Sequence, residues 1–114
     1  MIWNYSKNFQ QWNQYFQAAF DLAADLWEVS ADDLKARDRR ELIVKMRTVL
    51  IKILVDRNLT HHWVAQKFKR HHTSIAHNLK LHDQFLEIDP EYAENYKAAS
   101  AKFREICEER DLKR

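Results

Sequence analysis

The sequence contains no glycine and a single proline, Pro90. Glycine adopts positive φ at the least cost, so its absence makes tight two-residue β-hairpins nearly impossible. Loops that cradle the phosphates of a nucleotide also need glycines, and their absence excludes a nucleotide site of that type. We therefore expect an all-α protein that binds no nucleotide.

Cysteines and long apolar runs are also scarce. Cys107 is the only cysteine, so no internal disulfide can form, as is usual in a reducing cytoplasm. No run of apolar residues approaches the length of a membrane span, and the first residues are too polar for a secretory signal. We expect a cytoplasmic protein without a membrane partner.

Charge is distributed unevenly along the chain, although the formal net charge is only +2. Residues 35–80 hold twelve Lys or Arg and three acids, a net charge of +9, whereas the other residues hold seven basic and fourteen acidic groups, a net charge of −7. Five of the six histidines also lie within residues 35–80. This asymmetry favours a polyanionic partner on one side, and a merely solvated face is the alternative.

Apolar spacing and capping signals predict a single domain of about six helices. A first helix, unusually aromatic, precedes a core of residues 29–106. Ser30 can cap a short helix, and Asp89-Pro90-Glu91 is a strong helix start. The expected helices span about residues 4–28, 31–36, 39–56, 60–68, 72–86 and 90–111.

The pattern of apolar residues also predicts how two of these helices pack. Apolar positions from Leu42 to Leu54 span most of the circumference of the third helix, so it should be the buried central one. The first helix is expected to pack on the domain, with an oligomer contact as the alternative.

Residues 60–85 have the spacing of a helix-turn-helix, with a short helix, a three-residue turn and a second helix. In such motifs the N-terminal residues of the second helix enter the major groove of DNA. Here these residues are cations and hydroxyl groups that can donate to phosphates or base edges: Lys69, Arg70, His71, His72, Thr73 and Ser74. Together with the local charge of +9, the motif predicts binding to duplex DNA.

At residues 68–77 the chain reads FKRHHTSIAH, which resembles the signature of the C-terminal DNA-binding domain of DnaA, the bacterial chromosomal replication initiator. In that family the stretch reads Phe-Gly-Gly-Arg-Asp-His-Thr-Thr-Val-x-His. Residues 27–35, WEVSADDLK, are similar to the family's entry into the same domain. The resemblance covers about residues 26–103 and implies a Trp-repressor-like helical bundle, to which the aromatic first helix is an addition.

The sequence departs from the family in three places. Thr48 stands where the family has a glutamine, beside the arginine that touches phosphate there. Lys69 stands where the family has two glycines, so the turn is one residue shorter. His71 replaces an aspartate and cannot accept from cytosine N4 as a carboxylate does. Without the family's ATPase domain, the sequence resembles a free-standing bacterial or phage regulator of replication initiation or transcription.

The motif and the resemblance together give two sets of expected DNA contacts. The base-reading candidates are Arg39, Arg40, Arg70, His71, His72 and Thr73, with the resemblance implying that Arg39 or Arg40 reaches the minor groove. The phosphate candidates are Arg37, Lys45, Arg47, Thr60, Lys69, Ser74, His77 and Lys80. For Arg47, the resemblance implies a phosphate contact from the long third helix.

Other functions have weaker support in the sequence. The histidines at positions 61, 62, 71, 72 and 77 crowd together, but histidines adjacent in a helix diverge and the one cysteine is distant, so we expect no metal. We expect neither a cofactor nor an enzyme, because no carboxylate pair or nucleophile–base pattern stands out. The main alternative is a helical protein-interaction module or adaptor, acting through the aromatic first helix or the acidic last one.

Overall fold

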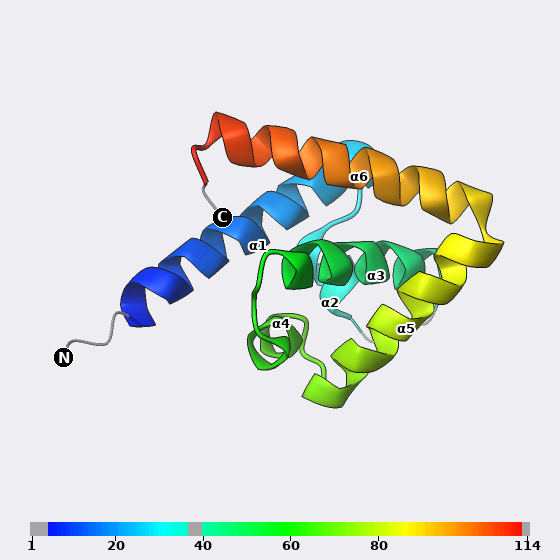
Figure 1. Cartoon of the computed structure of the whole chain (residues 1–114), viewed down its shortest axis with the longest axis horizontal. Helices are drawn as coiled ribbons and strands as arrows, with labels where there is room; N and C mark the ends of the chain where they lie inside the picture. Colours follow the sequence, from blue (N-terminus) through cyan, green and yellow to red (C-terminus); the bar gives the residue numbers. More distant parts are fainter. Residues whose placement is uncertain (1–4, 37–39, 113–114) are drawn as a thin grey trace.

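The computed structural model describes residues 5–36 and 40–112, with side chains for residues 9–36 and 40–112. Within these ranges every regular element is an α-helix, which confirms the prediction of an all-α fold with six helices. The helices are α1 (Tyr5–Trp27), α2 (Ala31–Lys35), α3 (Glu41–Asp56), α4 (His61–Lys67), α5 (His72–Ile88) and α6 (Pro90–Glu109). Figure 1 shows α6 across one side of the bundle, α1 beside it, and α3 in the middle.

The two expected capping residues begin their helices as predicted. The Ser30 hydroxyl accepts a hydrogen bond from the Asp33 amide at 3.1 Å, and the Asp33 carboxylate accepts one from the Ser30 amide at 3.3 Å. This reciprocal pair is a capping box, which satisfies amides that the first turn of α2 leaves free. At the start of α6, Asp89 Oδ1 accepts from the Tyr92 amide at 3.1 Å.

The predicted boundaries of two other helices were less accurate. Helix α3 begins at Glu41, because Arg40 has a non-helical backbone with ψ of 134°. Helix α5 extends to Ile88, past the expected end at residue 86, and stops before Asp89-Pro90. Proline disfavours a helical conformation in the residue before it, which explains the stop.

Among residues 5–36 and 40–112, four non-glycine residues take positive φ, and each follows the C-terminus of a helix: Glu28, Asn58, Lys69 and Asp111. After α4, Lys69 has a φ of 56°, its amide donates to Gln66 O at 3.2 Å, and the Arg70 amide donates to Ala65 O at 2.8 Å. These two bonds form a Schellman motif, whose left-handed position is normally taken by glycine. With no glycine in the chain, Lys69 occupies this position and bears the steric cost.

Helix α3 is the centre of the fold, as predicted, and contacts all five other helices. Its residues Leu50, Ile51 and Leu54 are fully buried. The prediction was wrong for Leu42, which is 59% exposed. Helical periodicity placed Leu42 on an apolar face, but in the first turn of α3 no neighbouring helix covers it.

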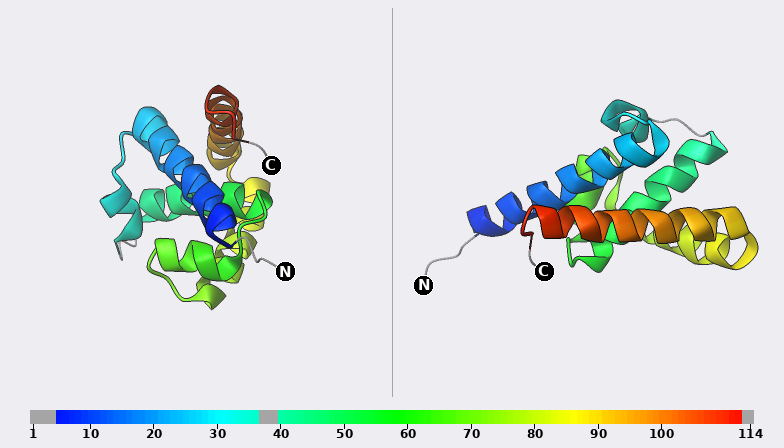
Figure 2. Two further views of the ribbon diagram at one scale, coloured as in Figure 1. Left: turned by 90° about the vertical axis from the view of Figure 1, so that its left-hand side faces the viewer. Right: turned by 90° about the horizontal axis from the view of Figure 1, so that it is seen from above.

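The aromatic helix α1 packs on this core, as expected. Phe16 contacts Phe20 with ring centroids 4.3 Å apart and Trp63 of α4 at 5.8 Å. Phe20 also contacts Phe68, at 5.6 Å. Figures 1 and 2 show the N-terminal end of α1 projecting beyond the other helices, and there Phe9 is 44% exposed.

Candidate nucleic-acid interface

Helix α5 has one buried face and one exposed face. Its buried side chains are Ile75, Asn78 and His82. The exposed residues Thr73, His77 and Lys80 are spaced i, i+4 and i+7, so they lie along one face of the helix. A hydroxyl, an imidazole and an ammonium group therefore line the outer side of the second helix of the motif.

The first turn of α5 is organised by His71, which caps the helix. Its Nδ1 accepts from the Thr73 amide at 3.4 Å and lies 2.8 Å from Thr73 Oγ1. Free amides at a helix N-terminus carry partial positive charge and attract anions. His71 therefore contributes one nitrogen to the cap, and only its Nε2 remains for the base contact that the sequence predicted.

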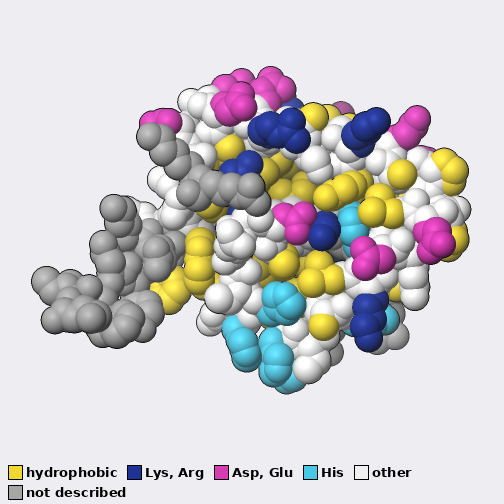
Figure 3. Space-filling model, viewed as in Figure 1, with side chains coloured by type: hydrophobic (Ala, Val, Ile, Leu, Met, Phe, Trp, Pro, Cys, Tyr) yellow, Lys and Arg dark blue, Asp and Glu magenta, His cyan; other side chains and the backbone are white. Residues whose placement is uncertain are grey.

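Three imidazole rings lie against one another at this end of the motif, one pair of them stacked. The rings of His62 in α4 and His72 in α5 are 4.3 Å apart at 26°, and those of His71 and His72 are 4.4 Å apart. Figure 3 shows histidine side chains gathered at one edge of the molecule. Desolvation, followed by the charges of His62 and His71, lowers the pKa of His72 below its ordinary value. An anion placed beside His72 would oppose this effect and favour its charged form.

Two arginines converge on the C-terminal end of α2. Arg47 donates from Nε to Leu34 O at 2.8 Å and from Nη2 to Ala36 O at 3.0 Å. Arg70 donates from Nη2 to Ala36 O at 2.7 Å. We call these two side chains the arginine clamp. It ties the end of α2 to α3 and to the turn before α5.

The predicted phosphate contact of Arg47 is wrong. Its side chain is only 5% exposed and its guanidinium bonds backbone carbonyls, so it lies inside the molecule and not on a surface where a phosphate could contact it. Arg70 is half-buried, and its guanidinium also donates to a backbone carbonyl, that of Ala36, so in this structure the group is engaged within the molecule. Both residues hold the end of α2.

The predicted phosphate contact of Lys45 is not supported either. Its ammonium lies 2.6 Å from Asp89 Oδ2 and 3.0 Å from Glu41 Oε1. The hydrogen bond to Asp89, and then that to Glu41, raise the pKa of Lys45 above its ordinary value. A lysine that is paired with two carboxylates is already neutralised, so it is a poor phosphate contact.

The other candidates fall into three groups. Lys69, Thr73, His77 and Lys80 are exposed, as is Arg40 before α3. Thr60 caps α4, with its hydroxyl accepting from the Trp63 amide at 3.2 Å, and Ser74 is half-buried. Arg37 and Arg39 lie outside the described residues.

Sequence reasoning missed two contacts that support this surface. His62 was weighed only as a metal ligand, yet its ring stacks on His72 across the turn. Asn78 donates from Nδ2 to Thr48 Oγ1 at 3.1 Å, which ties the buried face of α5 to α3. The only signal for the second contact is that residue 78 falls on the stripe of Ile75 and His82.

Other chemistries find little support among the described residues. They contain no group of three or more His, Cys, Asp or Glu that could hold a metal ion. Burial raises the pKa of the Cys107 thiol, which makes it a poor nucleophile. No helix among residues 5–36 and 40–112 is both long and apolar enough to cross a membrane.

Comparisons of the chain with protein-family models, with curated proteins and with solved structures found no match.

Proposed function

We propose that this chain binds duplex DNA through the helix-turn-helix of α4 and α5, with the N-terminal half of α5 in the major groove. The observation that carries the proposal is the exposed first turn of α5, with His72 and Thr73 next to Lys69, in the part of the chain with a net charge of +9. The arginine clamp adds support, because it holds the end of α2 beside this turn.

Each exposed residue has a role in this proposal. His72 and Thr73 face base edges, where the threonine methyl can contact thymine and its hydroxyl can hydrogen bond. Lys69, His77 and Lys80 neutralise phosphates, which supplies affinity without sequence information. Arg39 or Arg40 reaches the adjacent minor groove.

The resemblance of residues 68–77 to the initiator's signature suggests the biological setting. We infer a sequence-specific regulator of replication initiation or transcription, associated with the nucleoid. His71 in place of the family's aspartate makes a changed preference at one base position the expected result.

Selection from a random pool of duplexes tests the proposal. The selected sequences should share a site, and affinity for any duplex should fall steeply as the salt concentration rises, because bound cations release counterions. A salt slope near zero, or no duplex binding at low salt, would contradict DNA binding. A steep slope without an enriched site would retain DNA binding and reject sequence specificity.

A second candidate function is self-association or a protein contact through α1. It is favoured by the projecting end of that helix, where Phe9 is 44% exposed and no acidic residue precedes Asp21. Light scattering after size-exclusion chromatography measures the mass of the wild-type chain and of Phe9→Ser. A monomeric wild type at all concentrations would reject self-association, whereas a dimer lost in Phe9→Ser would support it.

A further inference from the structure

A hollow on the surface, distinct from the proposed DNA-binding face, lies between the end of α1, the first half of α3 and the start of α6. Its volume is about 150 Å³. The residues around it are Trp27, Glu41, Leu42, Lys45, Met46, Val49, Asp89, Glu91, Tyr92 and Asn95. A dry cavity of about this volume holds one aromatic ring in other proteins.

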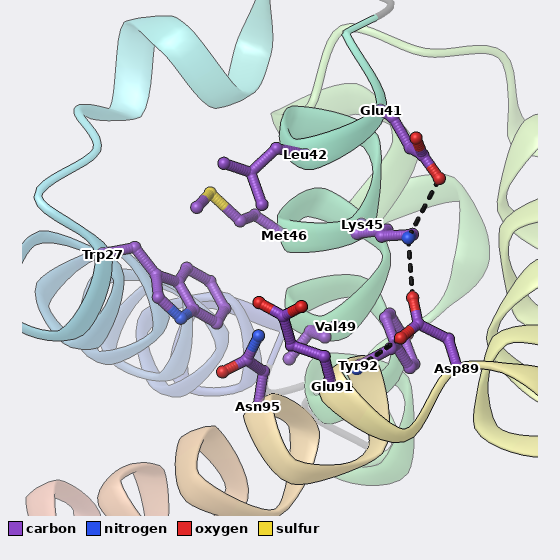
Figure 4. Close-up of a pocket in the computed structure, with 10 residues that line it drawn as sticks. All are labelled: Trp27, Glu41, Leu42, Lys45, Met46, Val49, Asp89, Glu91, Tyr92 and Asn95. Carbon is purple, nitrogen blue, oxygen red and sulfur yellow. Dashed lines mark hydrogen bonds and ion pairs between the residues drawn. The ribbon is translucent and has the colours of Figure 1, made fainter.

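One wall of the hollow is apolar and presents a ring surface. Leu42 and Met46 project from α3 on one side, and the indole of Trp27 faces the hollow from α1 (Figure 4). Leu42 is 59% exposed, a large exposure for an aliphatic side chain. This wall suits an apolar body, and the indole can also attract a cation to its face.

The opposite wall is acidic. Figure 4 shows the Glu91 carboxylate and the Asn95 amide pointing from α6 toward Trp27. Glu41 and Asp89 are both paired with Lys45, and Glu91 has no hydrogen bond or ion pair from its side chain within the described part of the chain. Three carboxylates against one lysine leave a net charge of −2 at the mouth. The charge therefore selects a cation over an anion.

We propose that this hollow binds a small organic cation, namely a primary amine carried on a single aromatic or branched aliphatic group. The apolar body lies against Trp27, Leu42 and Met46, and the ammonium pairs with Glu91 between the indole and the carboxylate. The small volume fits one ring-sized group. This site does not depend on DNA binding by α5, so either proposal can fail without the other.

The test uses the full chain labelled with ¹⁵N and three probes that share one ring: 2-phenylethylammonium, 2-phenylethanol and 2-phenylacetate. The amine should shift the indole N–H of Trp27 and the amides of Leu42, Met46 and Glu91 in a saturable way. The alcohol should bind more weakly than the amine, and the acetate should cause no saturable shift. Equal binding of all three probes, or shifts elsewhere, would overturn the proposal.

Matched variants identify the group that selects the cation. Glu91→Gln should weaken amine binding about twofold to fivefold, the range of an exposed ion pair, and Glu94→Gln on the same helix outside the hollow should leave it unchanged. Asn95→Trp should block the mouth and abolish binding while the spectrum stays dispersed. Wild-type affinity in both Glu91→Gln and Asn95→Trp would reject this site. Tighter binding of an acetylated Leu-Lys amide than of the free amine would identify a polypeptide as the occupant, and would also overturn the proposal.

Discussion

Arg47 and Arg70 donate to the same carbonyl oxygen, that of Ala36, at 3.0 and 2.7 Å. One arginine comes from the central helix and the other from the turn of the helix-turn-helix, so a single backbone atom joins the two to the end of α2. A carbonyl oxygen has two lone pairs and can accept both bonds. This junction joins the end of α2 to α3 and to the residue that follows the turn after α4.

Removing Arg47 should destabilise the fold more than removing Arg70. Arg47→Met leaves the Leu34 carbonyl without its charged donor, and we expect a loss of about 1.5–3 kcal/mol in the free energy of unfolding. Arg70 is half-buried, so solvent can replace its bonds, and Arg70→Met should cost less than about 1 kcal/mol. Urea denaturation measures both. Equal stability of Arg47→Met and wild type would show that the clamp does not hold α2.

Substitutions at Thr73 and Lys80 should distinguish a contact to a base from a contact to a phosphate. Thr73→Ala should cost roughly 1–3 kcal/mol of binding at a preferred site and much less on random duplexes. Lys80→Ala should weaken binding to all duplexes alike and reduce the salt slope by about one unit. Lys97→Ala, an exposed charge on α6, is the matched control and should change neither quantity. Fluorescence anisotropy measures the affinity of each variant for the preferred site and for random duplexes. If Thr73→Ala lost the same affinity on the two kinds of duplex, Thr73 would not contact a base in the major groove.

Lys69→Gly should stabilise the protein while weakening DNA binding. A non-glycine residue at positive φ costs about 1–2 kcal/mol, partly offset by the greater freedom of glycine in the unfolded chain, so we expect a net gain of about 0.5–1 kcal/mol. Asn58→Gly, at another position of positive φ, should gain less, because asparagine tolerates this conformation. Thermal unfolding compares the two variants. A loss of stability in Lys69→Gly would mean that the lysine makes stabilising contacts in the turn.

DNA affinity should rise as the pH falls, because of His72. Its pKa is lowered in the free protein, chiefly by desolvation, and a nearby phosphate favours the protonated ring, so complex formation takes up a proton. Affinity measured between about pH 8 and pH 6, which brackets the ordinary histidine pKa, should increase at fixed ionic strength. Changing His72 and His77 to Gln should remove most of the increase. Full retention of the pH dependence in this double variant would place both rings away from DNA.

Stability of the free protein should fall in mild acid because of His82. The side chain is 1% exposed, Nδ1 lies 2.7 Å from the Tyr92 hydroxyl, and Nε2 is buried with no partner within the described residues. Burial lowers the pKa of His82, so below about pH 6.5 the unfolded chain binds a proton that the folded chain does not. The contribution of neutral His82 to the free energy of unfolding is therefore complete above about pH 6.5, and it is lost as the pH falls toward the lowered pKa.

Denaturation with urea at about pH 7.5 and pH 5 measures the effect on both sides of the ordinary histidine pKa. His82→Leu should reduce the pH dependence, whereas His72→Gln, which removes an exposed histidine whose pKa is also lowered, should reduce it less. The pKa of Asp89 is lowered, mainly by its hydrogen bond with Lys45. Asp89 therefore stays ionised at both pH values and does not contribute to the difference in stability between them. An unchanged pH dependence in His82→Leu would show that His82 is not the responsible group.

Local features of the sequence were enough to predict the helices and several of their ends. The capping box at Ser30 and the start of α6 at Asp89 involve residues three positions apart, so spacing alone reveals them. The absence of glycine predicted the all-α fold, because strands joined by tight turns need positive φ. The positions of α4 and α5 and the exposure of Thr73, His77 and Lys80 also follow from helical periodicity.

Only the tertiary structure decided which side each charged or apolar group would face. Arg47 was expected at a phosphate and is buried, because the carbonyls at the end of α2 lie within its reach. Leu42 was expected in the core and is 59% exposed, whereas its neighbour Ile43 in the same turn is buried, because the packed side of the turn does not include Leu42. Periodicity fixes the angle of a side chain around its own helix, but burial depends on neighbours that are distant in sequence. The packing of α2 and α6 against α3 supplied those neighbours.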